Sequence, residues 1–102
     1  MAIMEFSIFP LDKGSSLSEY VSGALSIVHE SGLEYRLNPM GTVVEGEWDD
    51  LLALLTRCFR VLEKDSDRIS LNVKFDCRKG VSGAIDRKIL SVEKKAGRSF
   101  LT

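Results

Sequence analysis

The chain has little of what most catalytic and metal-binding sites are built from. Its 102 residues include one histidine, His29, and two cysteines, Cys58 and Cys77. A zinc site built on paired histidines is therefore excluded, and the cysteines lack the C-x-x-C spacing of redox and metal motifs. We expect two unlinked thiols, because free cysteine packs as a small hydrophobe. No metal and no cofactor are expected.

An excess of one charge and long apolar runs are also missing. Fourteen Lys and Arg against 15 Asp and Glu give a net charge of −1, which leaves no basic field to attract nucleic acid or anionic lipid. No stretch approaches the ~20 apolar residues of a membrane-spanning helix, and no basic segment precedes an apolar run near the start. We therefore expect a soluble, intracellular protein with neither nucleic acid nor membrane as partner.

Motifs of catalysis are absent too. The chain contains no G-x-S-x-G elbow, no P-loop and no G-x-G-x-x-G. Adjacent carboxylates at Asp49-Asp50 and at Asp65 and Asp67 are explained by a helix start and a polar turn. His29 is expected on the exposed flank of a helix. We predict that the protein is not an enzyme.

What is present is the periodicity of one globular domain, residues 1–102, with an ordinary apolar fraction of 44%. Apolar and polar residues alternate in four segments, which predicts strands: residues 3–9, 33–38, 42–45 and 69–76. Apolar residues recur at helical spacing in two others: residues 16–31 and 47–62.

Local signals predict where these segments begin and end. Ser16 and Glu19 form a capping-box pattern, so the first helix is expected to start at Ser16. Gly32 predicts its end, because glycine tolerates the left-handed conformation found there. Met40-Gly41 is expected to turn the chain between the second and third strands.

The apolar positions predict which side chains face the core. In the first strand Met4, Phe6 and Ile8 share one face, because side chains alternate along a strand. The second helix is expected to turn six residues inward: Trp48, Leu51, Leu52, Leu55, Phe59 and Leu62. Residues 85–95 predict a short further helix, capped by Ser91, with three inward residues: Ile85, Ile89 and Val92.

The order strand, helix, strand, strand, helix, strand predicts the fold class. Right-handed crossovers bring both helices onto one face of a four-stranded antiparallel sheet. This is the α+β class, a ferredoxin-like βαββαβ sandwich, here with a short C-terminal helix. The other face of the sheet is expected to be uncovered. It mixes Ile3 and Phe9 with polar residues, which suits a subunit interface or a ligand floor.

One segment, residues 38–47, is not explained by folding alone. A hairpin turn needs Gly41 and a strand end tolerates Gly46, but neither requires the hydroxyl of Thr42 or the carboxylate of Glu45. Strict alternation places Thr42 and Glu45 on opposite faces of one strand. Both reach the same ligand only through a bulge or a neighbouring subunit.

This segment resembles the thiamine-binding protein family, the YkoF-like domains. The resemblance extends over nearly the whole chain and is carried by six stretches: residues 8–11, 16–21, 31–35, 39–47, 73–78 and 87–95. It implies a non-catalytic, cytoplasmic binder of thiamine or of its hydroxymethylpyrimidine part, assembled as a homotetramer.

The chemistry of thiamine matches residue types in this sequence. A carboxylate such as Glu45 or Glu5 suits the cationic thiazolium. Ser7, Thr42 and the backbone at Gly41 offer the donors and acceptors that an aminopyrimidine needs. The candidate ligand-binding residues are seven: Ser7, Ser16, Met40, Gly41, Thr42, Glu45 and Asp76.

Two other functions stay open at this point. The chain is alternatively an interaction or regulatory module without a thiamine-type ligand, in which the open sheet only mediates assembly. An enzyme acting on a thiamine-like heterocycle is the weaker alternative, because no base with a partner is evident.

Overall fold

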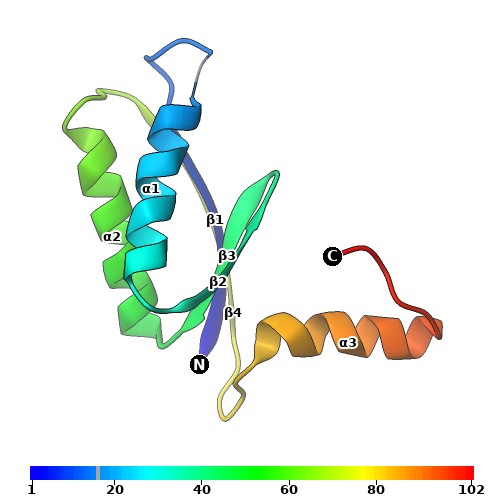
Figure 1. Cartoon of the computed structure of the whole chain (residues 1–102). Helices are drawn as coiled ribbons and strands as arrows, with labels where there is room; N and C mark the ends of the chain where they lie inside the picture. The colour runs from blue at the N-terminus through cyan, green and yellow to red at the C-terminus, as the bar shows by residue number, and fades with distance from the viewer. Residues whose placement is uncertain (16) are drawn as a thin grey trace.

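A computed structural model describes residues 1–15 and 17–102. Seven elements follow one another along the chain (Figure 1): β1 (Ala2–Pro10), α1 (Ser18–Glu30), β2 (Glu34–Asn38), β3 (Gly41–Gly46), α2 (Trp48–Glu63), β4 (Ile69–Cys77) and α3 (Ala84–Ala96). The strands form one antiparallel sheet in the order β2-β3-β1-β4. The predicted α+β, ferredoxin-like fold with a C-terminal helix is confirmed.

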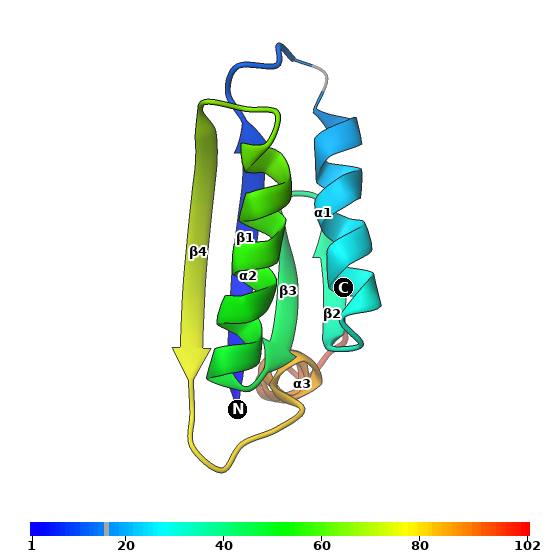
Figure 2. The ribbon, with the colours of Figure 1, turned by 90° about the vertical axis from the view of Figure 1, so that its left-hand side faces the viewer.

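Helices α1 and α2 cover one face of the sheet (Figure 2). Side chains alternate along β1, so Met4, Phe6 and Ile8 point under these helices and are at most 5% exposed, as predicted. The opposite face, which we call the open face, carries Ile3, Glu5, Ser7 and Phe9 of β1 together with their partners on β3 and β4.

The buried stripe of α2 differs from the predicted one. The residues of α2 that are buried in the core are Leu51, Leu54, Cys58 and Leu62. Trp48 and Leu52 were expected inward but are 47% and 36% exposed, because the stripe that faces β1 and β3 is rotated away from them. Trp48 instead packs on Phe75 of β4, with ring centroids 4.6 Å apart, at the edge of the sheet.

The first helix begins later than predicted. Ser16 lies outside the described residues, and α1 begins at Ser18 with Leu17 as its N-cap and no side-chain capping bond. The carbonyl of Leu17 accepts from the amides of Tyr20 and Val21, both at 3.1 Å, so the helical ladder starts there. Gly32 follows the helix with φ +75°, which confirms the predicted stop.

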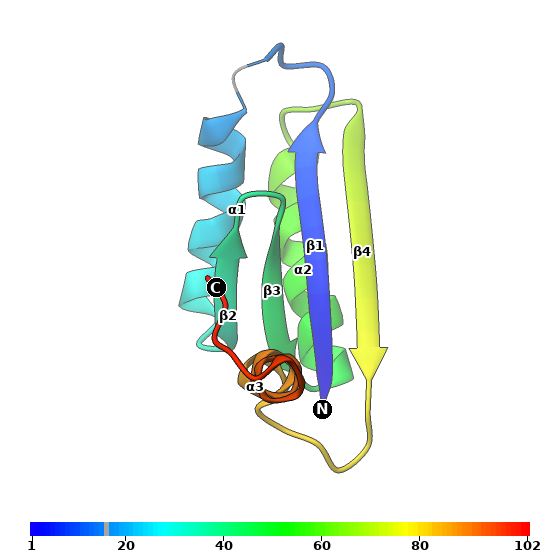
Figure 3. The same ribbon diagram turned by 90° about the vertical axis from the view of Figure 1, so that its right-hand side faces the viewer.

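Helix α3 stands on the open face and projects away from it (Figures 1 and 3). It follows Gly83, whose φ is +68°, and Ser91 lies in its middle, so the predicted cap at Ser91 is wrong. Ile85 is 5% exposed, but Val92 is 60% exposed, because only the first turns of the helix contact the sheet. The open face is therefore covered at one end.

Within the described ranges, no helix is long and apolar enough to cross a membrane. The same residues contain no cluster of three or more His, Cys, Asp or Glu side chains arranged to hold a metal ion.

The two cysteines are unlinked, as predicted, and they are expected to differ sharply in reactivity. Cys58 is 0% exposed, and burial raises the pKa of its thiol to about 11. Cys77 is exposed at the end of β4. Because the thiolate is the reactive form, a disulfide reagent should modify Cys77 quickly at mildly alkaline pH and Cys58 only after denaturation. Rapid modification of both thiols in the native protein would contradict this core packing.

Candidate functional site

The β2–β3 hairpin turns at Pro39 and Met40, and Gly41 is already the first residue of β3, opposite Asn38. The prediction that Gly41 makes the turn is therefore wrong. Its φ is not positive. A glycine is needed for a different reason: a Cβ at Gly41 would lie 3.1 Å from the carbonyl oxygen of Phe6.

We expect Gly41→Ala to destabilise the fold by about 1–3 kcal/mol, because the added methyl is forced against a backbone atom that cannot turn away. Gly23→Ala is the matched control, since a Cβ at Gly23 on α1 meets nothing within 4 Å. That change should stabilise by about 0.5–1 kcal/mol through better helix propensity. Urea unfolding measures both. Equal effects of the two substitutions would contradict the close approach at Gly41.

The hairpin is shorter than its neighbours, which leaves part of β1 without a strand beside it. Strand β1 pairs with β4 over all of Ala2–Pro10, but it pairs with β3 only from Ala2 to Phe6. Beyond Phe6 the edge of β1 that faces the hairpin has no strand partner among the described residues, and α1 lies alongside (Figure 3). Main-chain N–H and C=O groups that point to this edge therefore have no partner in the described part of the sheet.

A cleft of about 450 Å³, the hairpin cleft, surrounds this free edge. Its volume falls within the range of about 300–1,000 Å³ typical of small-molecule sites. Its walls are mostly apolar, with hydroxyl and amide groups near the hairpin. The lining residues are Phe6, Ser7, Ile8, Phe9, Val21, Ala24, Leu25, Leu37, Asn38, Pro39, Met40, Gly41, Thr42 and Asn72. Four of the seven predicted ligand residues thus meet in one place: Ser7, Met40, Gly41 and Thr42.

Thr42 is the polar residue of the cleft whose burial is hardest to explain by folding. It is 3% exposed and lies opposite Phe6 and Leu37 in the sheet. Its hydroxyl has no hydrogen-bond partner in the described part of the chain. In that part, every side-chain oxygen or nitrogen that is completely shielded from solvent does have a partner, so the Thr42 hydroxyl is not completely shielded. The hydroxyl therefore opens to the cleft. Because it opens to the cleft, this hydroxyl is available to donate to or accept from a bound ligand.

A second hollow of about 330 Å³ continues the hairpin cleft onto the open face. The two share four lining residues: Phe6, Ser7, Met40 and Asn72. The hollow adds the exposed carboxylate of Glu5, which lies between Val43 and Lys74 in the sheet. A carboxylate therefore lies next to the apolar cleft. It belongs to Glu5, which the sequence suggested beside Glu45 as a partner for the thiazolium.

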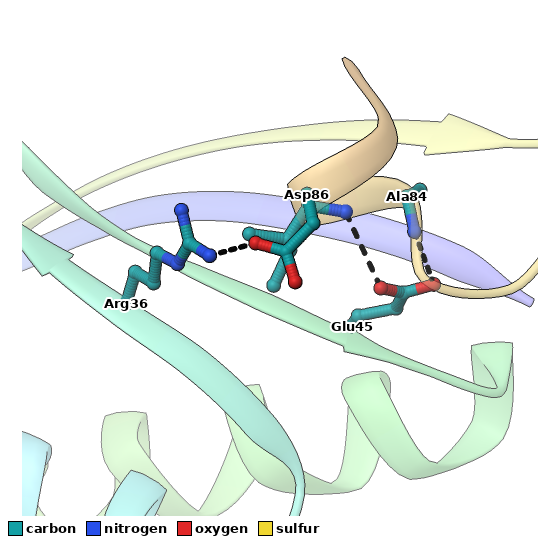
Figure 4. Close-up of polar contacts among 5 residues, drawn as sticks. Arg36, Glu45, Ala84 and Asp86 are labelled. Atoms are coloured by element: carbon teal, nitrogen blue, oxygen red, sulfur yellow. Dashed lines mark hydrogen bonds and ion pairs between the residues drawn. The ribbon is translucent and has the colours of Figure 1, made fainter. Parts of the chain in front are cut away.

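Glu45 has a structural partner elsewhere (Figure 4). It lies opposite Ile3, on the open face, so the predicted separation of Thr42 and Glu45 onto opposite faces is confirmed. Its carboxylate accepts from the backbone amides of Ala84, at 3.0 Å, and Ile85, at 3.4 Å. Glu45 is 4% exposed and does not line the hairpin cleft. It caps the first turn of α3, where the helix dipole favours negative charge.

Two ion pairs add to this attachment of α3. Arg36 of β2 pairs with Asp86 (Figure 4), and Lys88 pairs with Asp76 of β4. The hydrogen bond and the charge of Lys88 hold the pKa of Asp76 below its usual range. Because a lowered pKa marks a contact of the ionised form, this pair persists at neutral pH and is lost as the pH falls through that lowered value. Asp76 lies beside α3, away from the hairpin cleft.

Comparisons with known proteins show to which family this chain belongs. The family model described as Thiamine-binding protein matches residues 4–93. A UPF0045 protein of Methanocaldococcus jannaschii is 36% identical over 90 residues, which cover 88% of this chain and 90% of that protein. The UPF0045 protein YqgV of Bacillus subtilis is 32% identical over 100 residues, covering 92% and 96%.

Solved structures of similar proteins have the same fold. A crystal structure of a hypothetical protein from Methanocaldococcus jannaschii has a TM-score of 0.84 and 34% identity, and covers 91% of this chain and 96% of that one. A Thermotoga maritima protein, assigned provisionally to thiamine biosynthesis or salvage, has a TM-score of 0.77 at 22% identity over 89% and 97%, which shows the shared fold. With the family model spanning residues 4–93, the chain belongs to the thiamine-binding protein family.

Proposed function

We propose that the protein binds thiamine or its hydroxymethylpyrimidine part in the hairpin cleft, without transforming it. The observation that carries this proposal is the buried Thr42 hydroxyl, which opens to the cleft and lacks a partner among the described residues. Membership of the thiamine-binding family supports the ligand class. So does the thiamine biosynthesis or salvage role that is provisionally assigned to the Thermotoga maritima relative.

The pyrimidine end fits the cleft itself. A flat heteroaromatic ring is held between apolar walls such as Phe6 and Leu25. Its ring nitrogen and amino group need one donor and one acceptor. The hydroxyls of Ser7 and Thr42 and the free edge of β1 supply both kinds of group.

The thiazolium end fits the adjoining hollow. Glu5 supplies a negative charge there. Lys74, which lies opposite Glu5 in the sheet, partly neutralises that charge. Met40 is 90% exposed at the hairpin tip and lines both spaces. A polarisable thioether suits the face of a bound aromatic ring. We therefore assign the counter-charge to Glu5, because Glu45 is engaged by α3.

The lining of the cleft supports binding without catalysis. None of its described residues is His, Cys, Lys, Arg, Asp, Glu or Tyr. General acid–base catalysis needs a side chain that exchanges a proton near neutral pH, and nucleophilic catalysis needs an activated nucleophile. Within the described lining of the cleft, no base lies beside the two hydroxyls. Glu5 and Lys74 line the adjoining hollow, where we assign Glu5 to the thiazolium as a counter-charge.

We further propose that the protein assembles as a homotetramer. Helix α3 projects from the open face with Leu90 61% exposed, and Phe100, which follows the helix, is 45% exposed. Apolar side chains on a projecting segment suit burial against another copy. Light scattering at micromolar concentration should give a mass near four times 11.4 kDa. A stable monomer would contradict the assembly but leave the cleft proposal standing.

Ligand stabilisation tests the binding proposal. Thermal unfolding of ligand-free protein is compared in the presence of thiamine, hydroxymethylpyrimidine and thiamine phosphate. A ligand at about 100 times its dissociation constant adds ~2.7 kcal/mol of stability, and each kcal/mol raises the melting temperature by about 4–8 °C at this size. No shift with any of the three would overturn the proposal. An assembled protein without a shift would instead be the interaction module.

A further inference from the structure

A separate hollow of about 380 Å³, the α3 groove, lies at the other end of β1 from the hairpin cleft. It is formed between α3 and the end of the sheet where β1 begins and β4 finishes. The residues that line it are Met1, Ala2, Ile3, Asp76, Arg78, Val81, Ala84, Arg87, Lys88, Ser91 and Val92. It shares no residue with the hairpin cleft or with the hollow at Glu5.

The α3 groove concentrates positive charge in a chain whose net charge is −1. Three cations line it, Arg78, Arg87 and Lys88, against the single carboxylate of Asp76. Asp76 is paired with Lys88 and also feels the charge of Arg78, so among the described lining residues one carboxylate faces three cations. The side chain of Arg78 makes no hydrogen bond or ion pair within residues 1–15 and 17–102, and Arg87 donates only to the carbonyl of Ser82.

The donors come from both walls of the groove. On α3, Arg87 and Lys88 stand four and three residues before Ser91, so the three side chains share one helix face. On the sheet side, the backbone amide of Arg78 donates to the carbonyl of Met1 at 3.3 Å, which fixes Arg78 beside the start of β1. The amides at the start of α3 are taken by Glu45, so the groove offers side chains for recognition.

The rest of the lining of the α3 groove is mostly apolar. Five residues contribute to this apolar surface: Ala2, Ile3, Val81, Ala84 and Val92. An inorganic ion alone would leave this surface uncovered. A ligand with a charged head and an apolar body satisfies both parts of the groove.

We propose that the α3 groove binds a small organic phosphate, a phosphate monoester with an aromatic or other apolar body. A phosphate presents three terminal oxygens and close to two negative charges, which matches two guanidinium groups, one ammonium and one hydroxyl. The thiazolium cation of thiamine is repelled there. The site is independent of the function proposed for the hairpin cleft.

Phenyl phosphate is the probe, titrated by calorimetry against inorganic phosphate at two salt concentrations. The wild-type protein should bind phenyl phosphate at least tenfold more tightly than inorganic phosphate, and more weakly at the higher salt concentration. Absence of binding, or equal affinity for the two compounds, would overturn the proposal.

Matched variants locate the site. Arg78→Gln combined with Arg87→Gln should weaken phenyl phosphate binding at least tenfold, and Arg78→Gln alone should weaken it severalfold without disturbing any described contact. Lys94→Gln with Lys95→Gln removes two charges from the same helix outside the groove and should change affinity less than twofold. Equal losses in the two double variants would overturn the proposal.

Asp76→Asn should change the affinity for phenyl phosphate in the opposite direction. It removes the only carboxylate of the α3 groove and releases Lys88, so phenyl phosphate should bind severalfold more tightly. Weaker binding would contradict the assignment. Circular dichroism confirms that each variant is folded. The thermal shift with thiamine should be unchanged in all of them, so this proposal and the hairpin-cleft proposal can fail separately.

Discussion

Glu45→Ala is expected to release α3 from the sheet and leave the rest of the fold intact. Glu45 is the one carboxylate that accepts from the amides of Ala84 and Ile85, and it is 4% exposed. Loss of a capping side chain costs about 0.5–2 kcal/mol, and an isolated helix shorter than about 12–15 residues is marginal in water. The 13 residues of α3 should therefore fray once they are undocked.

Hydrogen exchange measures this release. In Glu45→Ala, protection of the amides in α3 should fall tenfold or more, while β1 and α2 keep theirs. Glu45→Gln keeps an acceptor oxygen but loses the charge, so its effect should be intermediate. Glu47→Ala is the control, because Glu47 is exposed and makes no capping bond at α2. Unchanged protection of α3 in Glu45→Ala would show that the two ion pairs alone hold the helix.

Glu5→Gln should distinguish the contacts of the thiazolium end of the ligand from those of the pyrimidine end. If Glu5 balances the thiazolium, losing its charge removes an ion pair of an exposed carboxylate, worth about 0.2–1 kcal/mol, which is up to about a fivefold loss of thiamine affinity. Hydroxymethylpyrimidine has no thiazolium, so its affinity should change less than twofold. Glu34→Gln, an exposed carboxylate on β2 outside the cleft, is the control.

Thr42→Val tests the pyrimidine end in the same titrations. It keeps the size and branching of the side chain and removes the hydroxyl, so thiamine and hydroxymethylpyrimidine should weaken by the same factor. A neutral hydrogen bond is worth about 0.5–1.5 kcal/mol, or roughly a twofold to tenfold loss. Thr56→Val on the exposed side of α2 is the control. Wild-type affinity in both Glu5→Gln and Thr42→Val would move the site away from the hairpin cleft.

The alternation of residues in the sequence was enough to predict the sheet and its faces. Met4, Phe6 and Ile8 lie under the helices because side chains along a strand alternate strictly. The same rule separated Thr42 from Glu45, and the register confirms it without a bulge. The start of the first helix was less well predicted: Ser16 lies outside the described residues, and the helical ladder begins at the carbonyl of Leu17.

Features that depend on distant contacts had no local signal. The position of α3 is fixed by Glu45, which lies 39 and 40 residues before the amides that it caps. The hairpin cleft exists because β3 stops pairing with β1 at Phe6 while β4 continues to Pro10. The lengths of the predicted strands do not reveal where the pairing stops, because that depends on which residues lie opposite each other in the sheet. The need for glycine at position 41 likewise follows from a neighbouring strand.

The three methionines of the chain allow the most direct test of where thiamine binds. Met40 lines the hairpin cleft, Met1 lines the α3 groove, and Met4 is 0% exposed in the core. The protein is labelled at the methionine methyl groups, the signals of Met4 and Met40 are assigned with Met4→Leu and Met40→Leu, which leaves the third signal to Met1, and thiamine is titrated in. Binding in the hairpin cleft predicts that the Met40 signal shifts in a saturable way while those of Met4 and Met1 stay in place. A shift of Met1 with Met40 unmoved, or no shift at saturating thiamine, would contradict it.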